Sequence, residues 1–318
     1  MSDKKKKYWA GLDLGGTKML AKIYDGDFNE LGTDKNKTEG HRGPESVLER
    51  MGKSIRNALD EADVSEKELC GIGIGCPGPV DPEAGVLLQA PNLGWENVSI
   101  RKIFEKEFDC PVVPCNDVDS GVFGEYKFGA ARDARSAVGI FPGTGIGGGA
   151  VINGRLLQGA NITCMEIGHI PFGEAGLTLE EVCSRLAIAS ESAAAAYRGQ
   201  APYILENCGT DMAKITSGKI ADAIENGDVA IEKIVKEAAV RLGSGVATVV
   251  QLIAPEVVVI GGGLVEAIPK LFLKALKKSV HEKVLAPFRG RYRIVEAELG
   301  DDAGVLGAAA WAAKLVEG

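Results

Sequence analysis

Asp13-Leu14-Gly15-Gly16-Thr17-Lys18 and Gly143-Thr144-Gly145-Ile146-Gly147-Gly148-Gly149 are the two stretches of this sequence that decide its fold. In each, an apolar strand breaks at glycines and a second apolar strand follows, which predicts a tight hairpin turn. Glycine reaches positive φ angles and has no side chain, so successive backbone N–H groups of such a turn can point at one anion. Most glycine turns only reverse the chain. Two of them, in the two halves of one chain, favour a nucleotide held between two lobes.

The second stretch also contains the Gly-x-Gly-x-x-Gly spacing of a dinucleotide-binding turn. That motif binds pyrophosphate at the N-terminus of a helix, with an acidic ribose ligand about 20 residues further on. Here the glycines lead into a predicted strand, and Glu166 stands before Ile167-Gly168-His169 rather than at the end of a second strand. Neither turn is followed by Gly-Lys-Ser or Gly-Lys-Thr. A nicotinamide-dependent dehydrogenase and a Walker-type phosphate loop are therefore both disfavoured.

The composition is that of an ordinary globular protein, with 45% hydrophobic and 25% charged residues, and the length of 318 residues favours two lobes. A net charge of -8 disfavours nucleic acid as a partner, because such affinity comes mainly from lysine and arginine. The basic run 4–7 is too short for a signal peptide. Seven cysteines without a Cys-x-x-Cys pair, and three histidines, indicate reduced thiols and no metal framework. We expect a cytoplasmic protein that binds neither nucleic acid nor a membrane.

Apolar periodicity predicts that strands and helices are mixed in both halves of the chain. A hairpin is expected over 8–24 and a second one at Asn153-Gly154. Further strands are expected over 70–76, 111–115, 136–141 and 257–260, and helices over 44–62, 121–125, 228–253 and 303–316. This order predicts an α/β protein.

Two carboxylates stand at the ends of predicted strands. Asp117 follows Asn116 at the end of the strand 111–115. A carboxylate in that position can accept the proton of a hydroxyl during phosphoryl transfer, but it can also cap the helical segment 121–125. Asp13 ends the first strand, where it can face metal-bound phosphates or simply close the turn. The residues by themselves leave both alternatives open.

A set of motifs spread over almost the whole chain resembles the successive signatures of the ROK family of repressors, open reading frames and sugar kinases. In order, these motifs are 13–18, Pro77-Gly78-Pro79-Val80-Asp81, Ala90-Pro91-Asn92-Leu93-Gly94-Trp95, Asn116-Asp117, 143–149, Glu166-Ile167-Gly168-His169 and Gly261-Gly262-Gly263. The resemblance implies the two-lobed actin-like ATPase fold of hexokinases. It implies a smaller lobe of residues 1–117 plus 303–318 and a larger lobe of residues 118–302, with sugar and ATP in the cleft between them.

The resemblance also implies a role for each matched residue. Asp117 is implied to be the catalytic base, and Asp13 to lie near Mg²⁺, which contacts it through water or the phosphates. The ATP phosphates are implied to contact Gly15, Gly16, Thr17, Lys18, Gly143, Thr144, Gly145, Gly262 and Gly263. The sugar is implied to contact Gly78, Asn92, Asn116, Asp117, Glu166 and His169.

The chain departs from the family pattern after His169. Typical members carry there a zinc-binding cysteine cluster followed by a glutamate that touches the sugar, whereas residues 170–179 contain no cysteine. Thr178-Leu179-Glu180 stands in the place of the last cysteine and the glutamate, so Glu180 is implied to be that sugar contact. No zinc site is expected, and the sequence does not say what orients His169 instead.

The function implied by the resemblance is that of an ATP- and Mg²⁺-dependent hexokinase, with glucose as acceptor and O6 as the phosphorylated atom. Residues 91–98 look most like those of glucokinase members. A kinase for an N-acetylhexosamine, mannose or fructose is an alternative, and a non-catalytic sugar-binding protein is another. Repressors of the family carry an N-terminal helix-turn-helix domain, and seven residues precede Tyr8, so a kinase is expected rather than a DNA-binding regulator. Family members are often homodimers or homotetramers, and we expect the same here.

Overall fold

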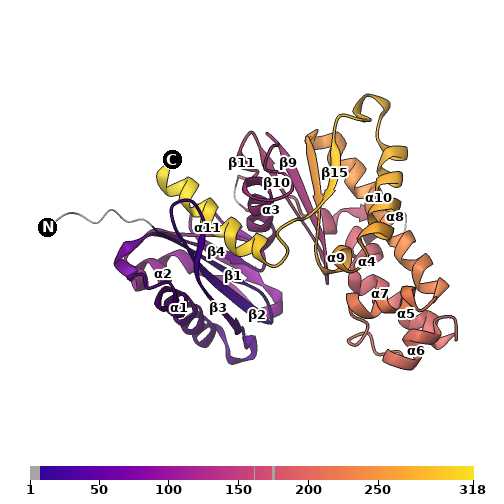
Figure 1. The fold of residues 1–318 in the computed structure, drawn as a ribbon, viewed down its shortest axis with the longest axis horizontal. Helices are drawn as coiled ribbons and strands as arrows, with labels where there is room; N and C mark the ends of the chain where they lie inside the picture. Colours follow the sequence, from indigo (N-terminus) through magenta and orange to yellow (C-terminus); the bar gives the residue numbers. More distant parts are fainter. Residues whose placement is uncertain (1–7, 161, 174–175) are drawn as a thin grey trace. The chain divides into compact units, whose positions relative to one another are not determined.

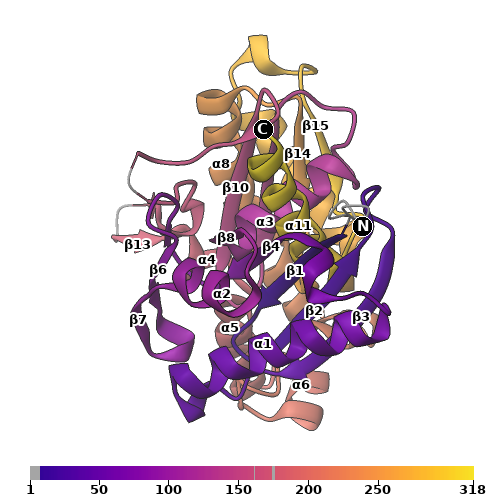
Figure 2. The same cartoon turned by 90° about the vertical axis from the view of Figure 1, so that its left-hand side faces the viewer.

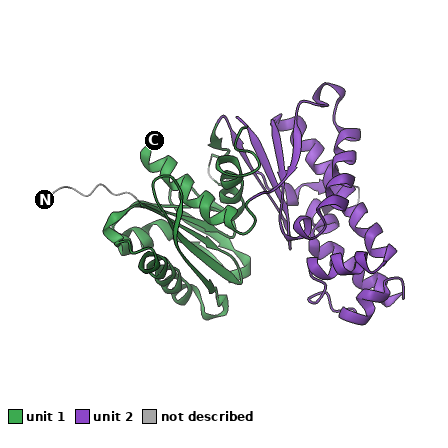
Figure 3. Cartoon of the chain, in the orientation of Figure 1, with its two compact units in different colours: residues 1–133, 154–164, 299–318 green, residues 134–153, 165–298 purple. Residues whose placement is uncertain are grey.

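The computed structural model describes residues 8–160, 162–173 and 176–318. The chain is divided into two compact units (Figure 3). Unit 1 comprises Met1–Asp133, Gly154–Cys164 and Leu299–Gly318, and unit 2 comprises Ala134–Asn153 and Met165–Glu298. The sequence prediction ends the first lobe at residue 117, whereas in this division residues 118–133 also belong to unit 1.

Unit 1 is built on a five-stranded sheet with the order β3-β2-β1-β4-β8. β1 (Tyr8–Leu14), β2 (Lys18–Tyr24) and β3 (Glu30–Lys37) are antiparallel neighbours, and β4 (Leu69–Cys76) and β8 (Val112–Asn116) run parallel to β1. Helices α1 (Pro44–Glu61) and α2 (Ile100–Phe108) lie on one side, and α3 (Asp117–Lys127) and α11 (Asp302–Glu317) on the other (Figure 1 and Figure 2). Because β1, β4 and β8 are parallel, their carboxyl ends meet at the same edge of the sheet.

Unit 1 also contains a small sheet and short helical turns. The small sheet has the order β5-β6-β7, formed by Val80–Asp81, Val86–Ala90 and Trp95–Val98. The 3₁₀ turns of this unit are η1 (Gly40–Arg42), η2 (Glu66–Glu68) and η3 (Pro91–Leu93). The core beneath α1 follows the predicted helical spacing, since Val47, Met51 and Ile55 are fully buried.

Helices α3 and α11 pack so closely that their backbones touch, and glycines make this approach possible. A Cβ atom on Gly307 would lie 1.8 Å from the carbonyl oxygen of Ser120, and one on Gly124 would lie 2.4 Å from that of Ala303. Phe123 packs edge-on against Trp311, with ring centroids 5.1 Å apart. This contact explains why α3 belongs to unit 1, although the sequence places the boundary before it.

Unit 2 contains a second sheet in which β9 lies between β10 and β14, and β15 pairs with β14. Its strands are β9 (Ala137–Pro142), β10 (Ile146–Ile152), β14 (Val257–Ile260) and β15 (Arg293–Glu296). The short strand β11 (Arg155–Leu156) belongs to the segment Gly154–Cys164 of unit 1. The helices of this unit are α4 (Leu179–Cys183), α5 (Arg185–Tyr197), α6 (Pro202–Cys208), α7 (Ser217–Glu225), α8 (Val229–Ile253), α9 (Gly263–Ala267) and α10 (Pro269–Lys283). A short hairpin, β12 (Pro171–Phe172) and β13 (Leu177–Thr178), and the turns η4 (Ile167–His169) and η5 (Ala286–Phe288) complete it. Among the described residues, no helix is long and apolar enough to span a membrane.

The strands and helices expected from periodicity are confirmed. Both glycine stretches connect antiparallel strands, β1 to β2 and β9 to β10. The Asn153-Gly154 dipeptide has positive φ angles of 50° and 78°, as a tight primed hairpin turn requires. The sequence analysis did not identify β3, the β5-β6-β7 sheet, the β12-β13 hairpin or α4 to α7.

The close backbone contact between α3 and α11 should make the protein sensitive to any side chain at Gly307. We expect Gly307→Ala to lower the free energy of unfolding by about 1 to 3 kcal/mol, because the added methyl group has no room. Gly218→Ala in α7 is the matched control. Only a side-chain oxygen at 3.9 Å stands near its new Cβ atom, so helix propensity should stabilise this variant by about 0.5 to 1 kcal/mol. Urea denaturation of both variants measures the difference, and equal stabilities would contradict the packing described.

Candidate active site

The first glycine turn joins β1 to β2 and is closed by three hydrogen bonds. The N–H of Gly15 donates to the carbonyl oxygen of Lys18 at 2.9 Å. Buried Thr38 donates its hydroxyl to the Gly15 carbonyl at 2.7 Å and its N–H to the Thr17 carbonyl at 2.9 Å. Gly16 and Thr17 are exposed at the tip. The turn therefore presents a fixed backbone to solvent, as a phosphate-binding turn requires.

Asp13 lies at the carboxyl end of β1, between β4 and α11. Glycines on both sides make room for it, since Cβ atoms on Gly75 and Gly304 would come within 3.3 Å and 3.0 Å of its carboxyl group. Burial raises the pKa of Asp13, and the nearby carboxylates of Asp117 and Asp301 raise it further, to about 7. A deprotonated Asp13 is therefore electrostatically costly unless a cation lies beside it.

The Asp13 carboxylate fits a magnesium ion that also binds phosphate. Mg²⁺ prefers oxygen ligands, and one carboxylate together with substrate phosphates and waters is a common set. Within the described ranges, no three His, Cys, Asp or Glu side chains gather as a metal site. A cation beside Asp13 would therefore take most of its ligands from phosphate and water.

Asn116 and Asp117 stand where β8 passes into α3. Asn116 is the helix cap, since its Oδ1 accepts the N–H groups of Val118 at 2.9 Å and Asp119 at 3.2 Å. Its Nδ2 donates to the Gly78 carbonyl at 3.1 Å. Asp117 is the first residue of the helix, and its Oδ1 also accepts the Val118 N–H, at 2.9 Å. The cap that the sequence allowed for Asp117 is thus supplied by Asn116.

Other predicted residues of unit 1 lie near the same edge of the sheet. Gly78 follows β4 and packs against β6, where a Cβ atom would lie 2.1 Å from the carbonyl oxygen of Gln89. Asn92 belongs to η3, and its Cβ would lie 3.5 Å from a Cβ on Gly16, at the tip of the first glycine turn. The structure thus brings Asn116 to Gly78, Asp117 to Asp13, and Asn92 to the first glycine turn.

The second glycine turn joins β9 to β10 in unit 2. The N–H of Gly143 donates to the Gly145 carbonyl at 2.8 Å, and Thr144 is exposed. Glu180 packs behind this turn. Its Oε2 accepts the N–H of Ile146 at 2.7 Å, and a Cβ on Gly145 would lie 2.2 Å from that oxygen. Glu180, which the resemblance implies to be a sugar contact, therefore holds the second glycine turn with one of its two oxygens.

The third glycine run lies against the same turn region of unit 2. Gly262 begins α9 after β14, and a Cβ on it would lie 2.9 Å from the carbonyl oxygen of Pro142, the last residue of β9. β9 and β14 are parallel neighbours, so both end beside the second glycine turn. The structure therefore places Gly262 and Gly263 close to the predicted phosphate residues Gly143 to Gly145.

Glu166 directly precedes η4, His169 is the last residue of η4, and both are exposed. The β12-β13 hairpin follows in the sequence, and residues 174–175 lie outside the described residues. Thr178 caps α4 and exchanges hydrogen bonds with Glu181. These bonds lower the pKa of Glu181, with a smaller contribution from His169. A hairpin and a capped helix thus stand where typical family members carry the cysteine cluster, and Glu181 is the acidic neighbour of His169.

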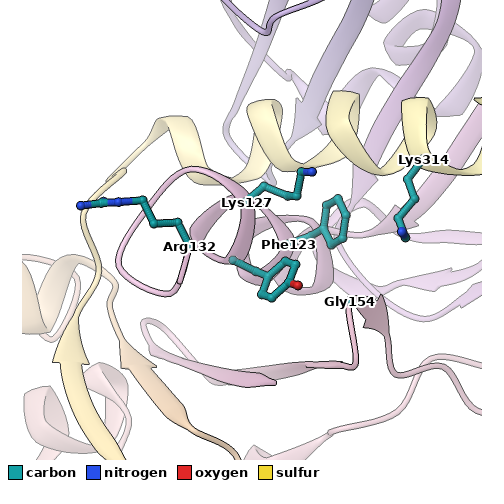
Figure 4. A pocket seen from close by; sticks show the side chains of 6 residues that line it. Phe123, Lys127, Arg132, Gly154 and Lys314 are labelled. Atoms are coloured by element: carbon teal, nitrogen blue, oxygen red, sulfur yellow. The ribbon is translucent and has the colours of Figure 1, made fainter. Parts of the chain in front are cut away.

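The structure also contains a cavity of about 220 Å³ in unit 1, separate from these residues (Figure 4). It is lined by Phe123, Tyr126, Lys127, Arg132, Gly154 and Lys314. No residue predicted to bind sugar, phosphate or metal lines it. The predicted site residues thus lie at strand ends and glycine turns, away from this cavity.

The sequence is similar to known proteins over almost its whole length. The model of the ROK family matches residues 9–315. The chain belongs to the ROK family. It is 32% identical to the glucokinase of Thermotoga maritima over 308 residues, which cover 94% of this chain and 95% of that one. It is 30% identical to the xylose repressor of Caldicellulosiruptor bescii over 272 residues, which cover 83% of this chain and 67% of the repressor.

Solved structures of ROK family proteins have the same fold as this chain. A ROK family glucokinase from Streptomyces griseus, crystallised with glucose and AMPPNP, superimposes with a TM-score of 0.82 at 28% identity, over 96% of this chain and 99% of that one. The predicted family and the α/β actin-like ATPase fold are confirmed. The relatives include both sugar kinases and repressors, so the residues of the site must carry the functional argument.

Proposed function

We propose that this chain is an ATP-dependent sugar kinase that transfers a phosphoryl group to a hexose hydroxyl, with glucose O6 as the preferred acceptor. The observation that carries the proposal is the pair of carboxylates at one sheet edge. Asp117 begins α3 beside Asp13, and Asp13 lies next to the first glycine turn. A proton acceptor and a group suited to a phosphate-bound cation are thus neighbours. The similarity to the glucokinases of T. maritima and S. griseus supports the same function.

In this proposal, Asp117 accepts the proton of the sugar hydroxyl as that oxygen attacks the terminal phosphorus of ATP. The bond from this phosphorus to the oxygen that bridges it to the β-phosphate breaks, and ADP leaves. Asn116 fixes the direction of Asp117 because it caps the same helix and is tied to Gly78. Phosphoryl transfer needs mainly positioning and charge neutralisation, so a fixed base fits this chemistry.

The two glycine turns would bind the phosphates of the donor through backbone N–H groups. The residues of the first turn are Gly15, Gly16, Thr17 and Lys18, and those of the second are Gly143, Thr144 and Gly145. Gly262 and Gly263 would add the start of α9. Mg²⁺, held near Asp13, neutralises charge on the phosphate oxygens when it is bound. Asp13 is the protein group that would orient this ion, directly or through water.

The proposed sugar contacts are the Gly78 backbone, Asn92, Asn116, Asp117, Glu166, His169 and Glu180. A polyol leaves water only if its hydroxyl groups find new partners, so a site of this kind discriminates against analogues that lack a hydroxyl. The amide of Asn116 and the carboxylate of Asp117 are such partners at the sheet edge. The second oxygen of Glu180 is the group that would contact sugar, since the first is bonded to Ile146.

A panel of sugars with ATP and Mg²⁺, followed by coupled detection of ADP, tests the proposal. We expect glucose to give the highest kcat/KM among glucose, mannose, fructose, N-acetylglucosamine and N-acetylmannosamine. A much higher value for another sugar would keep the kinase and change its substrate. Absence of turnover with every sugar, together with sugar binding in calorimetry, would identify a non-catalytic sugar-binding protein.

A further inference from the structure

We propose that Arg185 is a further phosphate-binding residue, which supplies the positive charge of the second glycine turn. This inference rests on the proposed function, because it takes the ligand of that turn to be the phosphates of a nucleotide. Arg185 is the first residue of α5 and follows Ser184, which caps the helix by accepting the Ala187 N–H at 3.1 Å. None of the motifs quoted from the sequence includes it.

Arg185 is fastened to the turn by its backbone and by its side chain. Its N–H donates to the Gly143 carbonyl at 2.9 Å. Its Nη2 donates to Oγ1 of Thr144 at 3.0 Å. The guanidinium therefore lies beside an exposed hydroxyl that is itself a predicted phosphate contact. A guanidinium carries five N–H donors in a planar fork, so donors remain for an anion at the same place.

The charge of Arg185 is not neutralised within the described part of the chain, where no carboxylate lies within ion-pair distance of its guanidinium. Other arginines of the same chain are paired. Arg241 of α8 binds Glu191 at 2.8 Å, and Arg56 binds Glu66 at 2.7 Å. A partly buried, unpaired guanidinium at a glycine turn is suited to a phosphate, which it can bind with two parallel hydrogen bonds.

Glu180 gives a second reason for a cation at this position. Its carboxylate lies behind Gly145 and accepts the Ile146 N–H, which uses one donor of the turn and places a negative charge beside it. An incoming phosphate is repelled by that charge unless a positive group compensates. Arg185 is attached to the two residues that precede Gly145, so it can compensate without disturbing the bond to Glu180.

Titration calorimetry of the full chain with ATP, ADP and adenosine tests the assignment. We expect Arg185→Ala to raise the Kd of ATP and ADP by about 10- to 100-fold, as for the loss of hydrogen bonds to a charged group. The Kd of adenosine should stay within about twofold of the wild-type value, because adenosine has no phosphate. Arg185→Lys should recover part of the loss by restoring the charge without the fork.

Arg198→Ala is the matched control, since Arg198 is an exposed arginine at the other end of α5, and all three affinities should be unchanged. Wild-type affinities for ATP and ADP in Arg185→Ala would overturn the assignment. An equal loss for adenosine would also overturn it, because the residue would then act by shaping the turn. Failure of the kinase proposal is seen separately, as absence of sugar phosphorylation by a wild-type protein that binds ATP.

Discussion

Asp117→Asn should lower kcat by about 10²- to 10⁴-fold while sugar affinity stays within a few-fold of the wild-type value. An amide keeps the shape and one acceptor oxygen of the carboxylate but cannot take the proton of the sugar hydroxyl, and general-base catalysis is typically worth that range. Oδ1 of residue 117 can still accept the Val118 N–H, and Asn116 still caps the helix. The variant should therefore fold normally and lose mainly the chemical step.

Steady-state kinetics with glucose and ATP measures kcat, and calorimetry with glucose alone measures affinity. Asp109→Asn is the control, because Asp109 is an exposed residue at the end of α2 and its kcat should stay within about twofold of wild type. If Asp117→Asn turned over at a near-normal rate, the base would have to be another residue. If sugar affinity fell as far as kcat, Asp117 would act chiefly as a sugar contact.

The candidate residues of unit 1 could largely be predicted from the sequence, because they stand at strand ends. A strand can be recognised from a short apolar run, and parallel strands bring their ends together at one edge. Asp13, Gly78 and Asn116 each follow directly from a predicted strand, and the structure gathers them at that edge.

The contacts at the second glycine turn of unit 2 could not be predicted from the sequence, because they depend on the tertiary packing of two helices. Glu180 and Arg185 reach the second glycine turn from α4 and α5. Glu180 lies 34 residues after its partner Ile146, and Arg185 lies 41 residues after its partner Thr144. Sequence separations of this size do not indicate a contact. Only the packing of the two helices brings them to the turn.

Glycines in the sequence indicate that α3 packs with α11 in unit 1, although the sequence prediction places the boundary before α3. Gly121 and Gly124 are three residues apart in α3, as are Gly304 and Gly307 in α11. Glycines at that spacing share one face of a helix and let two backbones approach. The contacts of Gly124 with Ala303 and of Gly307 with Ser120 are such an approach. Paired glycine faces would have predicted that α3 and α11 pack together.

Asp13→Asn should stabilise the ligand-free protein and at the same time abolish most of its activity. The pKa of Asp13 rises from 3.8 to about 7 in the folded state because of burial and the carboxylates of Asp117 and Asp301. Between these two values the folded protein binds more protons than the unfolded chain, so the free energy of unfolding falls as pH rises. The loss of unfolding free energy that comes from ionising Asp13 is complete above about pH 7. At about 1.4 kcal/mol per pKa unit it reaches roughly 4 kcal/mol, an upper limit because water still reaches part of the side chain.

Thermal unfolding of the ligand-free proteins at pH 8 and at lower pH measures this effect. We expect Asp13→Asn to have the higher Tm at pH 8, by an amount equivalent to about 1 to 3 kcal/mol, and the difference should shrink as the pH approaches 4. Asp60→Asn on the exposed face of α1 is the control and should leave Tm unchanged at both pH values. ATP with Mg²⁺ should raise the Tm of the wild type much more than that of Asp13→Asn, because the variant lacks the carboxylate beside the cation. A lower Tm for Asp13→Asn at pH 8 would show that this carboxylate stabilises the fold, and the role assigned to Asp13 would then have to be abandoned.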